Sequence, residues 1–185
     1  KLIKKINQVK HVDKVYKGYH FNGAVFKYGN VQSQAGTQIQ TWTPIYADKV
    51  IKAGRKPKAS NEIVIDKAFA KKSNTNWKSL LNKNITYTYV AYNAQNQPVP
   101  VTSTMKIVGI TDGGQSGTIF AATTAGVKKD LTKANAVTTA NFLTLSIKDT
   151  REIQSTVDAV NNLKENGKQA VAAISVGSVL KTINT

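Results

Sequence analysis

The sequence has 185 residues, of which 26 are basic and 10 acidic, so its net charge is +16, and it contains no cysteine. A chain of this length can bury a hydrophobic core without covalent cross-links, and the lack of cysteine excludes disulfides, thiolate metal sites and thiol redox chemistry. No stretch approaches the ~20 apolar residues of a membrane span, and no signal peptide is visible at Lys1.

The positive charge is carried by lysine, with only Arg55 and Arg151 as arginines, and it is spread along the whole chain. Proteins that read nucleic acids favour arginine for bidentate contacts to phosphate and guanine, so specific nucleic-acid recognition is not expected. Abundant lysine is first typical of a solvated surface. A face that binds polyanions remains the alternative, because a field of this sign attracts them.

The N-terminal third is expected to form a helix followed by short strands. Apolar residues recur at helical spacing in the first ten residues, and aromatic and β-branched residues follow. The dipeptide Asn22-Gly23 favours a tight turn, so the strands around it form a hairpin or one bent strand. The expected elements are a helix over 1–10, strands over 12–21, 24–28 and 38–43, and a polar loop over 29–36.

The central segment is expected to begin with a turn that is followed by a strand. Gly54 and Pro57 supply turn chemistry, a β-branched run follows, and Asp66 is placed to cap the next helix. Two later stretches rich in Thr, Tyr and Val, separated by a turn, predict paired strands with one exposed face. The expected elements are a strand near 62–65, helices over 67–72 and 76–81, strands over 85–92 and 99–110, and a flexible loop over 111–117.

The C-terminal part shows the clearest helical pattern. Asp149 and Glu152 predict a capping box, apolar residues then recur every three or four positions, and Gly167 is expected to end the helix. The other expected elements are a brief strand over 118–121, a short helix over 124–131, a buried strand over 142–147, a strand over 171–174 and a last helix over 176–183.

This order of elements predicts an α+β protein with a discontinuous domain. Strand, helix and strand at the C-terminal end, with a helix and a strand at the N-terminal end, suggest one α/β lobe built from both termini. We therefore expect residues 1–50 and 118–185 to form this terminal lobe. Residues 51–117 would be an inserted, β-rich second lobe.

Short motifs of the central segment resemble a known family in their order and spacing. They are Gly54-Arg55-x-Pro57, Asn61-Glu62-Ile63-Val64-Ile65, Leu80-Leu81-Asn82-Lys83-Asn84-Ile85 and Lys106-Ile107-Val108-Gly109-Ile110. Together they are similar to the extracytoplasmic core domain of MacB-like and FtsX-like ABC transporter permeases. That family usually has glycine where this chain has Asn82, and asparagine is the next residue most tolerant of left-handed φ.

The resemblance implies a MacB-like periplasmic core domain on the extracellular face of the cell membrane, excised from a permease and not an enzyme. Both of its ends would join transmembrane helices, with residues 1–10 and 176–185 as the mechanical couplings. The implied partners are a separate ABC ATPase subunit, a second permease in a dimer, and an envelope protein or an exported peptide, lipid or drug. A lysine-rich, cysteine-free chain fits a Gram-positive bacterium, so a pump that crosses an outer membrane is not expected.

The residues themselves do not predict a catalytic, cofactor or metal site. His11 and His20 lack the supporting ligands of a metal site and are interpreted as structural or surface residues. Ser116 lies in Gly-Gly-Gln-Ser-Gly, which does not match the Gly-x-Ser-x-Gly pattern of a nucleophile elbow, and no close pair of acids suggests general acid and base catalysis. We therefore expect no cofactor and no enzymatic activity; a hydrolase would require Ser116 beside one of the histidines.

Two features remain as a candidate partner or substrate surface. One is the aromatic pair on the strand over 85–92 and the other is the glycine-rich loop after residue 110. Its residues are Tyr87, Tyr89, Asp112, Gly113, Gly114, Gln115 and Ser116. The alternative to a transporter domain is a secreted cationic module that binds anionic cell-wall polymers.

Overall fold

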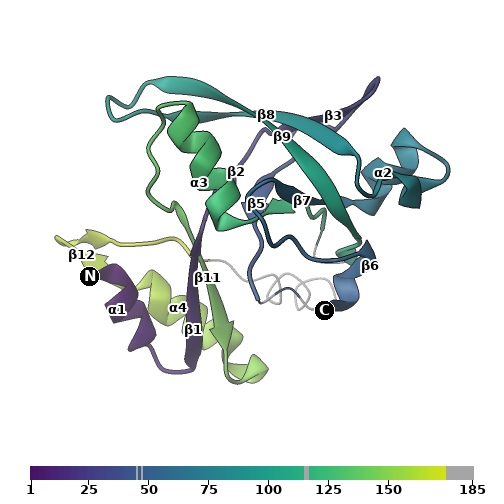
Figure 1. Ribbon diagram of the computed structural model, residues 1–185. Coiled ribbons are helices and arrows are strands. Elements are labelled where there is room, and N and C mark those ends of the chain that lie inside the picture. The colour runs from purple at the N-terminus through teal and green to yellow at the C-terminus, as the bar shows by residue number, and fades with distance from the viewer. Residues whose placement is uncertain (45, 47, 115–116, 174–185) are drawn as a thin grey trace. The chain divides into compact units, whose positions relative to one another are not determined.

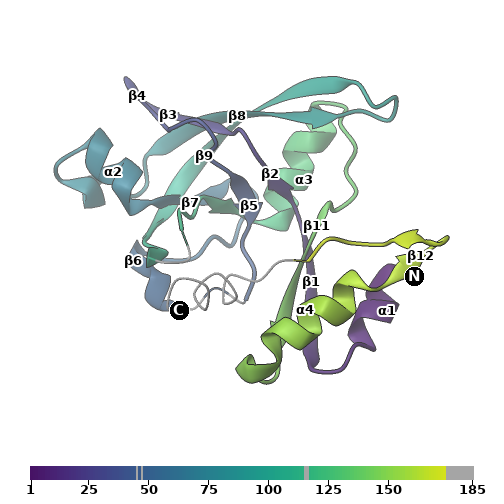
Figure 2. The same ribbon diagram turned by 180° about the vertical axis from the view of Figure 1, so that it is seen from behind.

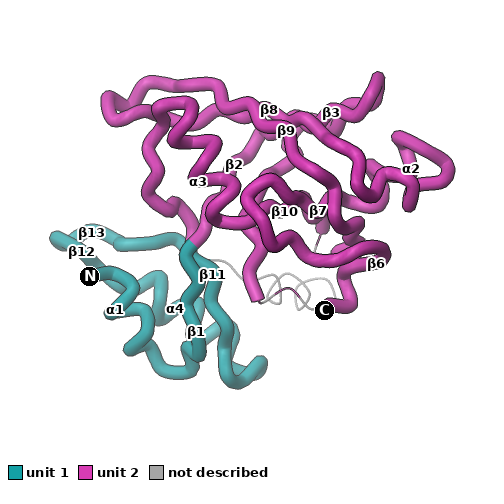
Figure 3. Tube along the Cα trace, in the orientation of Figure 1, with its two compact units in different colours: residues 1–17, 143–185 teal, residues 18–142 magenta. Residues whose placement is uncertain are grey.

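The structure is a computed structural model that describes residues 1–44, 46, 48–114 and 117–173 (Figure 1). The chain forms two compact units, one of residues 1–17 with 143–185 and the other of residues 18–142 (Figure 3). Both ends of the sequence thus belong to one unit. Within the described residues, no helix is both long and apolar enough to cross a membrane.

The terminal unit combines short helices with a two-stranded sheet and a small hairpin. Strands β1 and β11 pair with each other, and β12 pairs with β13. Ile6 on the first helix and Val160 on the last are almost fully buried, as the helical spacing predicted. The elements are α1 (Leu2–Asn7), β1 (Val12–Gly18), β11 (Phe142–Ile147), η4 (Thr150–Glu152), α4 (Ile153–Asn161), β12 (Lys164–Glu165) and β13 (Lys168–Gln169).

The central unit is built on a nine-stranded mixed sheet among the described residues, in the order β2-β5-β10-β7-β9-β8-β3-β4, with β6 paired to β9 (Figure 2). Its strands are β2 (His20–Phe21), β3 (Val25–Tyr28), β4 (Val31–Gln32), β5 (Ile39–Thr41), β6 (Ile51–Gly54), β7 (Glu62–Asp66), β8 (Asn84–Tyr92), β9 (Pro98–Thr111) and β10 (Ala121–Ala122). Its helices are η1 (Asp48–Val50), α2 (Lys67–Ser73), η2 (Trp77–Leu80) and α3 (Thr124–Lys133).

The larger of two hydrophobic clusters in the central unit fills the concave side of this sheet. The sheet curls so far that Phe21 of β2 contacts Tyr89 of β8, with ring centroids 4.6 Å apart. Phe26 stacks between Tyr87 and Phe120, at centroid distances of 4.8 and 4.1 Å. Helix α3 adds Val127 and Leu131 to this cluster, and α2 adds Phe69 and Ala70. The buried aromatic rings stabilise the sheet through both area and offset stacking.

The motifs of the central segment are explained by close backbone packing. Gly54 has φ +72°, and a Cβ on it would lie 2.1 Å from the carbonyl oxygen of Val108. A Cβ on Gly109 would lie 2.2 Å from the carbonyl oxygen of Arg55. Asn82 adopts φ 65°, as expected from its replacement of a glycine. Glycine is required at 54 and 109 because two backbone segments cross there with no room for a side chain.

The predicted lobes and the observed units differ in their boundaries. The sequence placed the boundaries near residues 50 and 118, whereas the units meet at 17/18 and 142/143. The reason is strand pairing: β3 binds β8, and β10 binds both β5 and β7. Residues 18–50 and 118–142 therefore contribute strands to the same sheet as the central segment.

Several local predictions are confirmed. Asp66 caps α2 by accepting a hydrogen bond from the Ala68 N–H at 2.9 Å. Strands β8 and β9 pair in antiparallel register from Asn84 opposite Lys106 to Tyr92 opposite Pro98, with one exposed face, and the buried end of β9 pairs with β6 and β7 instead. The predicted helix over 124–131 is α3, and the stretch over 76–81 forms the short 3-10 helix η2.

Other predictions need correction. The turn at Asn22-Gly23 does not close a hairpin, because β3 pairs with β4 and β8 instead of β2. Strand β11 is only partly buried, because it lies in a two-stranded sheet.

The C-terminal helix also differs from its prediction. Helix α4 ends at Asn161 and not near Gly167, because Asn166 and Gly167 take positive φ between β12 and β13. Residues 171–173 form no strand. The predicted helix over 176–183 and residue 174 lie outside the described residues.

The predicted capping box is only half formed. Asp149 accepts a hydrogen bond from the Arg151 N–H at 3.0 Å, so it does cap the 3-10 turn η4 that opens the helix. The Glu152 carboxylate, however, accepts from the Ser155 hydroxyl at 2.7 Å. The Asp149 carboxylate also accepts from the Arg151 guanidinium at 2.7 Å.

Candidate functional site

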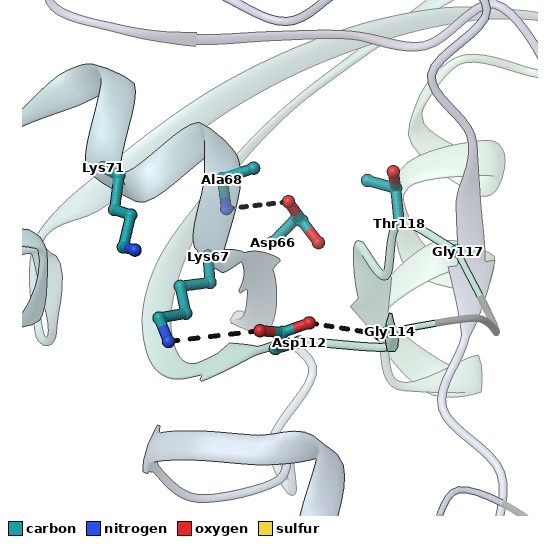
Figure 4. Close-up of a pocket in the computed structure, with 8 residues that line it drawn as sticks. All are labelled: Asp66, Lys67, Ala68, Lys71, Asp112, Gly114, Gly117 and Thr118. Atoms are coloured by element: carbon teal, nitrogen blue, oxygen red, sulfur yellow. Dashed lines mark hydrogen bonds and ion pairs between the residues drawn. The ribbon is translucent and has the colours of Figure 1, made fainter.

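A polar pocket of about 330 Å³ opens where two parallel strands end (Figure 4). Strands β7 and β9 are parallel neighbours, with Asp66 opposite Thr111 in the register. Their carboxyl ends therefore lie at the same edge of the sheet, which is where open α/β sheets commonly bind ligands. The pocket is lined by Asp66, Lys67, Ala68, Lys71, Asp112, Gly114, Gly117 and Thr118.

Hydrogen bonds hold the strand ends and the turn that border the pocket. The Thr111 hydroxyl, which is fully buried, can bond the carbonyl oxygens of Ile65 at 3.0 Å and Ile119 at 2.9 Å. It thus ties the end of β9 to the end of β7 and to the segment before β10. The Gly114 N–H donates to Asp112 Oδ1 at 3.1 Å and begins the glycine-rich turn.

The two carboxylates of the pocket have different surroundings. Asp66 is only 8% exposed, and burial raises its pKa, against the opposing effect of the Ala68 N–H. Asp112 is exposed and faces Lys67, with Nζ 4.0 Å from Oδ2. The same Lys67 Nζ lies 5.1 Å from the centroid of the Trp77 ring in a cation–π contact.

These groups are suited to binding polar partners. Lys67 and Lys71 lie one helical turn apart on α2 and supply donors, and Asp112 supplies an acceptor. No hydroxyl or thiol in the described lining lies beside a histidine. Within the described residues, no three His, Asp or Glu side chains are grouped so that they could hold a metal ion.

The structure is similar to two solved extracytoplasmic transporter domains. It matches the extracellular domain of the noncanonic ABC-type transporter YknZ from Gram-positive bacteria with a TM-score of 0.55 and 16% identity, over 94% of this chain and 87% of that one. It matches the periplasmic region of MacB from Actinobacillus actinomycetemcomitans with a TM-score of 0.56 and 16% identity, over 99% and 81%. The chain has the MacB-type extracytoplasmic fold. Neither a protein-family model nor a curated protein matches it in sequence.

The MacB-type fold is what the central motifs implied, and the matches extend over nearly the whole chain. The mixed helix and strand content is also that of the predicted α+β class. The motifs that carried the resemblance lie where backbones cross, at Gly54 and Gly109, and at the left-handed Asn82. At these three positions the motif residues are explained by the fold.

The structure separates the residues that were predicted to form a surface. Tyr87 and Tyr89 are each only 1% exposed and belong to the core, so their assignment to a surface was wrong. Side chains alternate between the two faces along β8. Tyr87 and Tyr89 therefore point to the concave side of the sheet, and the polar Thr86 and Thr88 point to the outer side. Burial raises the pKa of both tyrosines, as expected for phenols in a core.

The loop part of that prediction lies at the pocket. Asp112 and Gly114 line it, and Gly113 packs against Ile119 beside it. Gln115 and Ser116 lie outside the described residues. Asp66, Lys67 and Lys71 were not predicted as site residues, because Asp66 was interpreted only as a helix cap. The parallel pairing of β7 with β9 is what brings them to the same edge as Asp112.

The two histidines make the kind of contacts expected of structural residues. His20 Nε2 lies 2.8 Å from Gln38 Oε1, and its ring stacks on Phe142 with centroids 4.9 Å apart. His11 Nε2 lies 3.8 Å from a Glu152 carboxylate oxygen in the terminal unit. The Nε2 atom of each histidine thus lies near a polar side chain of its own unit.

Proposed function

We propose that the chain is the extracytoplasmic domain of an ABC transporter permease. The observation that carries this proposal is the likeness of nearly its whole length to the extracytoplasmic domains of YknZ and MacB. The domain would lie on the outer face of the cell membrane, and a separate cytoplasmic ATPase subunit would bind the membrane part of the permease. It would have no enzymatic activity of its own.

The organisation into two units supports a mechanical role. Residues 1–17 and 143–185 belong to one unit, so movements that enter through either end would reach the same compact body. The central unit is a single continuous sheet with a packed aromatic core, which suits a rigid element that is moved as a whole. ATP hydrolysis would thereby be coupled to export of a peptide, lipid or drug, or to activation of an envelope partner.

The pocket at the ends of β7 and β9 is the surface that we propose for the partner or cargo. Its lysines and Asp112 would bind polar groups of opposite charge, and Asp66 would keep the N-terminus of α2 in place. The paired substitution Lys67→Gln and Lys71→Gln should weaken transport or partner activation without loss of folding. Lys128→Gln with Lys133→Gln on α3 makes the same charge change elsewhere and serves as the control.

The experiment that tests the proposal starts from the complete reading frame and its native membrane. We expect spans of ~20 apolar residues before Lys1 and after Thr185, and an ABC ATPase that copurifies with the detergent-solubilised protein. A cleavable signal peptide before Lys1, with a stop codon or wall anchor after Thr185 and no copurifying ATPase, would overturn the proposal. The secreted cationic module would then be the better account.

A further inference from the structure

The outer face of β3, β8 and β9 is a polar platform that the pocket and the transporter role do not use. Side chains of paired strands that lie opposite each other point to the same face. The register places Lys27 beside Thr86 and Thr104 in one row, and Val25 beside Thr88 and Thr102 in the next. We call the four threonines with Lys27 and Lys106 the lysine–threonine face.

This face is open in the central unit. Lys27, Thr88, Thr102, Thr104 and Lys106 are exposed, and Thr86 is half-buried. Helix α3 packs on the opposite, concave side, where Val127 and Leu131 join the core. In both ribbon views α3 lies below β8 and β9, and no labelled helix lies above them (Figures 1 and 2).

The charge of the face is uncompensated. Strands β3, β4, β8 and β9 contain no acidic residue. The acid nearest in register is Glu62, opposite Lys106, and it is fully engaged by Arg55 and by the N–H groups of Lys58 and Ala59. The loop that binds Glu62 adds the exposed cations Lys56 and Lys58 at this end of the face.

The threonines offer hydroxyl groups to a ligand that lies across them. Thr86 and Thr104 have their Oγ1 atoms 3.2 Å apart, as do Thr88 and Thr102. In each pair one hydroxyl donates to the other, so the second keeps its proton for an outside acceptor. One pair lies in the row of Lys27 and the other in the next row, so both present O–H donors beside the lysines.

The shape and composition of the face select the class of ligand. From the row of Lys106 to the row of Tyr92 the hairpin extends eight residues, or about 27 Å, so the surface suits an elongated chain. At the far end the exposed Tyr92, which lies opposite Pro98, provides a flat apolar contact for a sugar or polyol unit. Lys106 and Lys27 lie in neighbouring rows at one end of the face, beside the threonine hydroxyls, and the exposed Val90 and Tyr92 lie at the other end. Cations next to hydroxyl donors match a chain in which phosphates lie next to hydroxylated units.

We propose that the lysine–threonine face binds a linear polymer of phosphodiester-linked polyol or sugar units. Lys27 and Lys106 hold phosphate oxygens, and the free threonine hydroxyls donate to phosphate or to hydroxyl groups between them. The site does not depend on the transporter role, and its test uses the 185-residue chain alone. Failure of the binding test leaves the proposed function untouched.

The test is titration of the chain with a soluble poly(glycerol phosphate) oligomer. We expect binding that weakens as salt rises from about 50 to about 200 mM. Lys27→Gln with Lys106→Gln should weaken it about tenfold, because two phosphate contacts are lost. Replacing Thr86, Thr88, Thr102 and Thr104 together by valine removes both members of each hydroxyl pair and should weaken it a few-fold at unchanged net charge. Lys128→Gln with Lys133→Gln removes the same charge from α3 and should have little effect.

Three outcomes would overturn the proposal. The first is an equal loss of affinity in the Lys27/Lys106 variant and in the Lys128/Lys133 variant. This would show that the polymer is attracted by the overall charge of the protein and not by this face. The second is an unchanged affinity of the threonine variant. The third is binding to phosphatidylglycerol vesicles but not to the soluble polymer, which would identify a membrane surface as the partner. Unchanged melting temperatures of the variants show that folding is preserved.

Discussion

Arg55 and Glu62 form a bidentate ion pair that closes the turn before β7, with Nη2 2.6 Å from Oε1 and Nη1 2.9 Å from Oε2. Glu62 Oε2 also accepts hydrogen bonds from the N–H groups of Lys58 at 2.7 Å and Ala59 at 3.0 Å. The Glu62 side chain is only 11% exposed, so this carboxylate organises the whole turn from within. The Gly-Arg-x-Pro and Asn-Glu motifs are therefore two halves of one structural element.

Glu62→Gln should destabilise the protein by about 1 to 3 kcal/mol, because the amide has only one acceptor oxygen and no charge to hold Arg55 and the N–H groups of Lys58 and Ala59. Chemical denaturation at pH 7 measures this change. Asp149→Asn is the control, since it breaks the exposed chelate of Asp149 and Arg151, where water replaces the contact. An equal loss in the two variants would contradict the special role of Glu62.

The pH dependence of stability should depend on Glu62. The Arg55 hydrogen bonds, helped by the Ala59 N–H, hold the pKa of Glu62 well below its ordinary value of 4.5. A carboxylate with a lowered pKa stabilises the native state above that ordinary value, and the contribution is lost as pH falls below it. Denaturation midpoints between pH 7 and pH 3 should fall more steeply in the wild type than in Glu62→Gln. Parallel curves would contradict this assignment.

Gly54→Ala should cost more stability than a glycine replacement in open space. A Cβ at Gly54 meets the Val108 carbonyl oxygen at 2.1 Å, whereas Gly23 has a similar φ, +71°, with nothing within 4 Å. The loss of unfolding free energy in Gly23→Ala, about 1 kcal/mol, thus measures the cost of the left-handed conformation alone. The additional loss in Gly54→Ala measures the cost of the clash with Val108. Equal destabilisation would show that the two backbones can separate.

Asn82 should be replaceable by glycine but not by alanine. Its φ of 65° places it in the left-handed region, and its N–H donates to the Ile107 carbonyl oxygen at 2.7 Å. Asn82→Gly keeps both features and should change the free energy of unfolding little, while Asn82→Ala should cost about 1 kcal/mol. A stable alanine variant would contradict the conformational explanation for this position.

Asp130→Asn should stabilise the protein at neutral pH. Burial raises the pKa of Asp130, and its Oδ2 and the Tyr89 hydroxyl are buried without a hydrogen-bond partner among the described residues. A raised carboxyl pKa means that ionisation opposes folding, and the cost appears as pH rises through the native pKa. The amide should raise the melting temperature by roughly 1 to 3 °C at pH 7 and by less near pH 4. A lower melting temperature at pH 7 would contradict it.

Local patterns were enough to predict the elements whose partners are close in sequence. The hairpin of β8 and β9 follows from alternation on either side of a short turn, and the Asp66 cap follows from a polar residue between a strand and a helix. The helix after Asp149 was placed correctly at its start. Its end was not, because Asn166 and Gly167 can end a helix or turn a hairpin, and only the pairing of β12 with β13 decides.

Non-local pairing is what the sequence could not supply. The strand β10 has two residues and joins β5 to β7 across the middle of the sheet, so its role has no local signature. The parallel pairing of β7 with β9 brings Asp66 and Asp112 to one edge, which made the pocket unpredictable from spacing. The shared face of Tyr87 and Tyr89 was recognised, but its direction was not, because aromatic side chains suit either side of an isolated hairpin.

Labelling of the turn between β8 and β9 in intact cells tests the central claim most directly. Ala94 is exposed in this turn and Ala91 is 2% exposed on β8, and residues 1–185 contain no cysteine. Ala94→Cys and Ala91→Cys therefore form a matched pair in the full-length protein, with any cysteine outside these residues replaced by serine. If the domain lies outside the membrane, an impermeant maleimide labels Ala94→Cys in intact cells and Ala91→Cys only after denaturation. Labelling of Ala94→Cys only after lysis would place the domain in the cytoplasm and contradict the account.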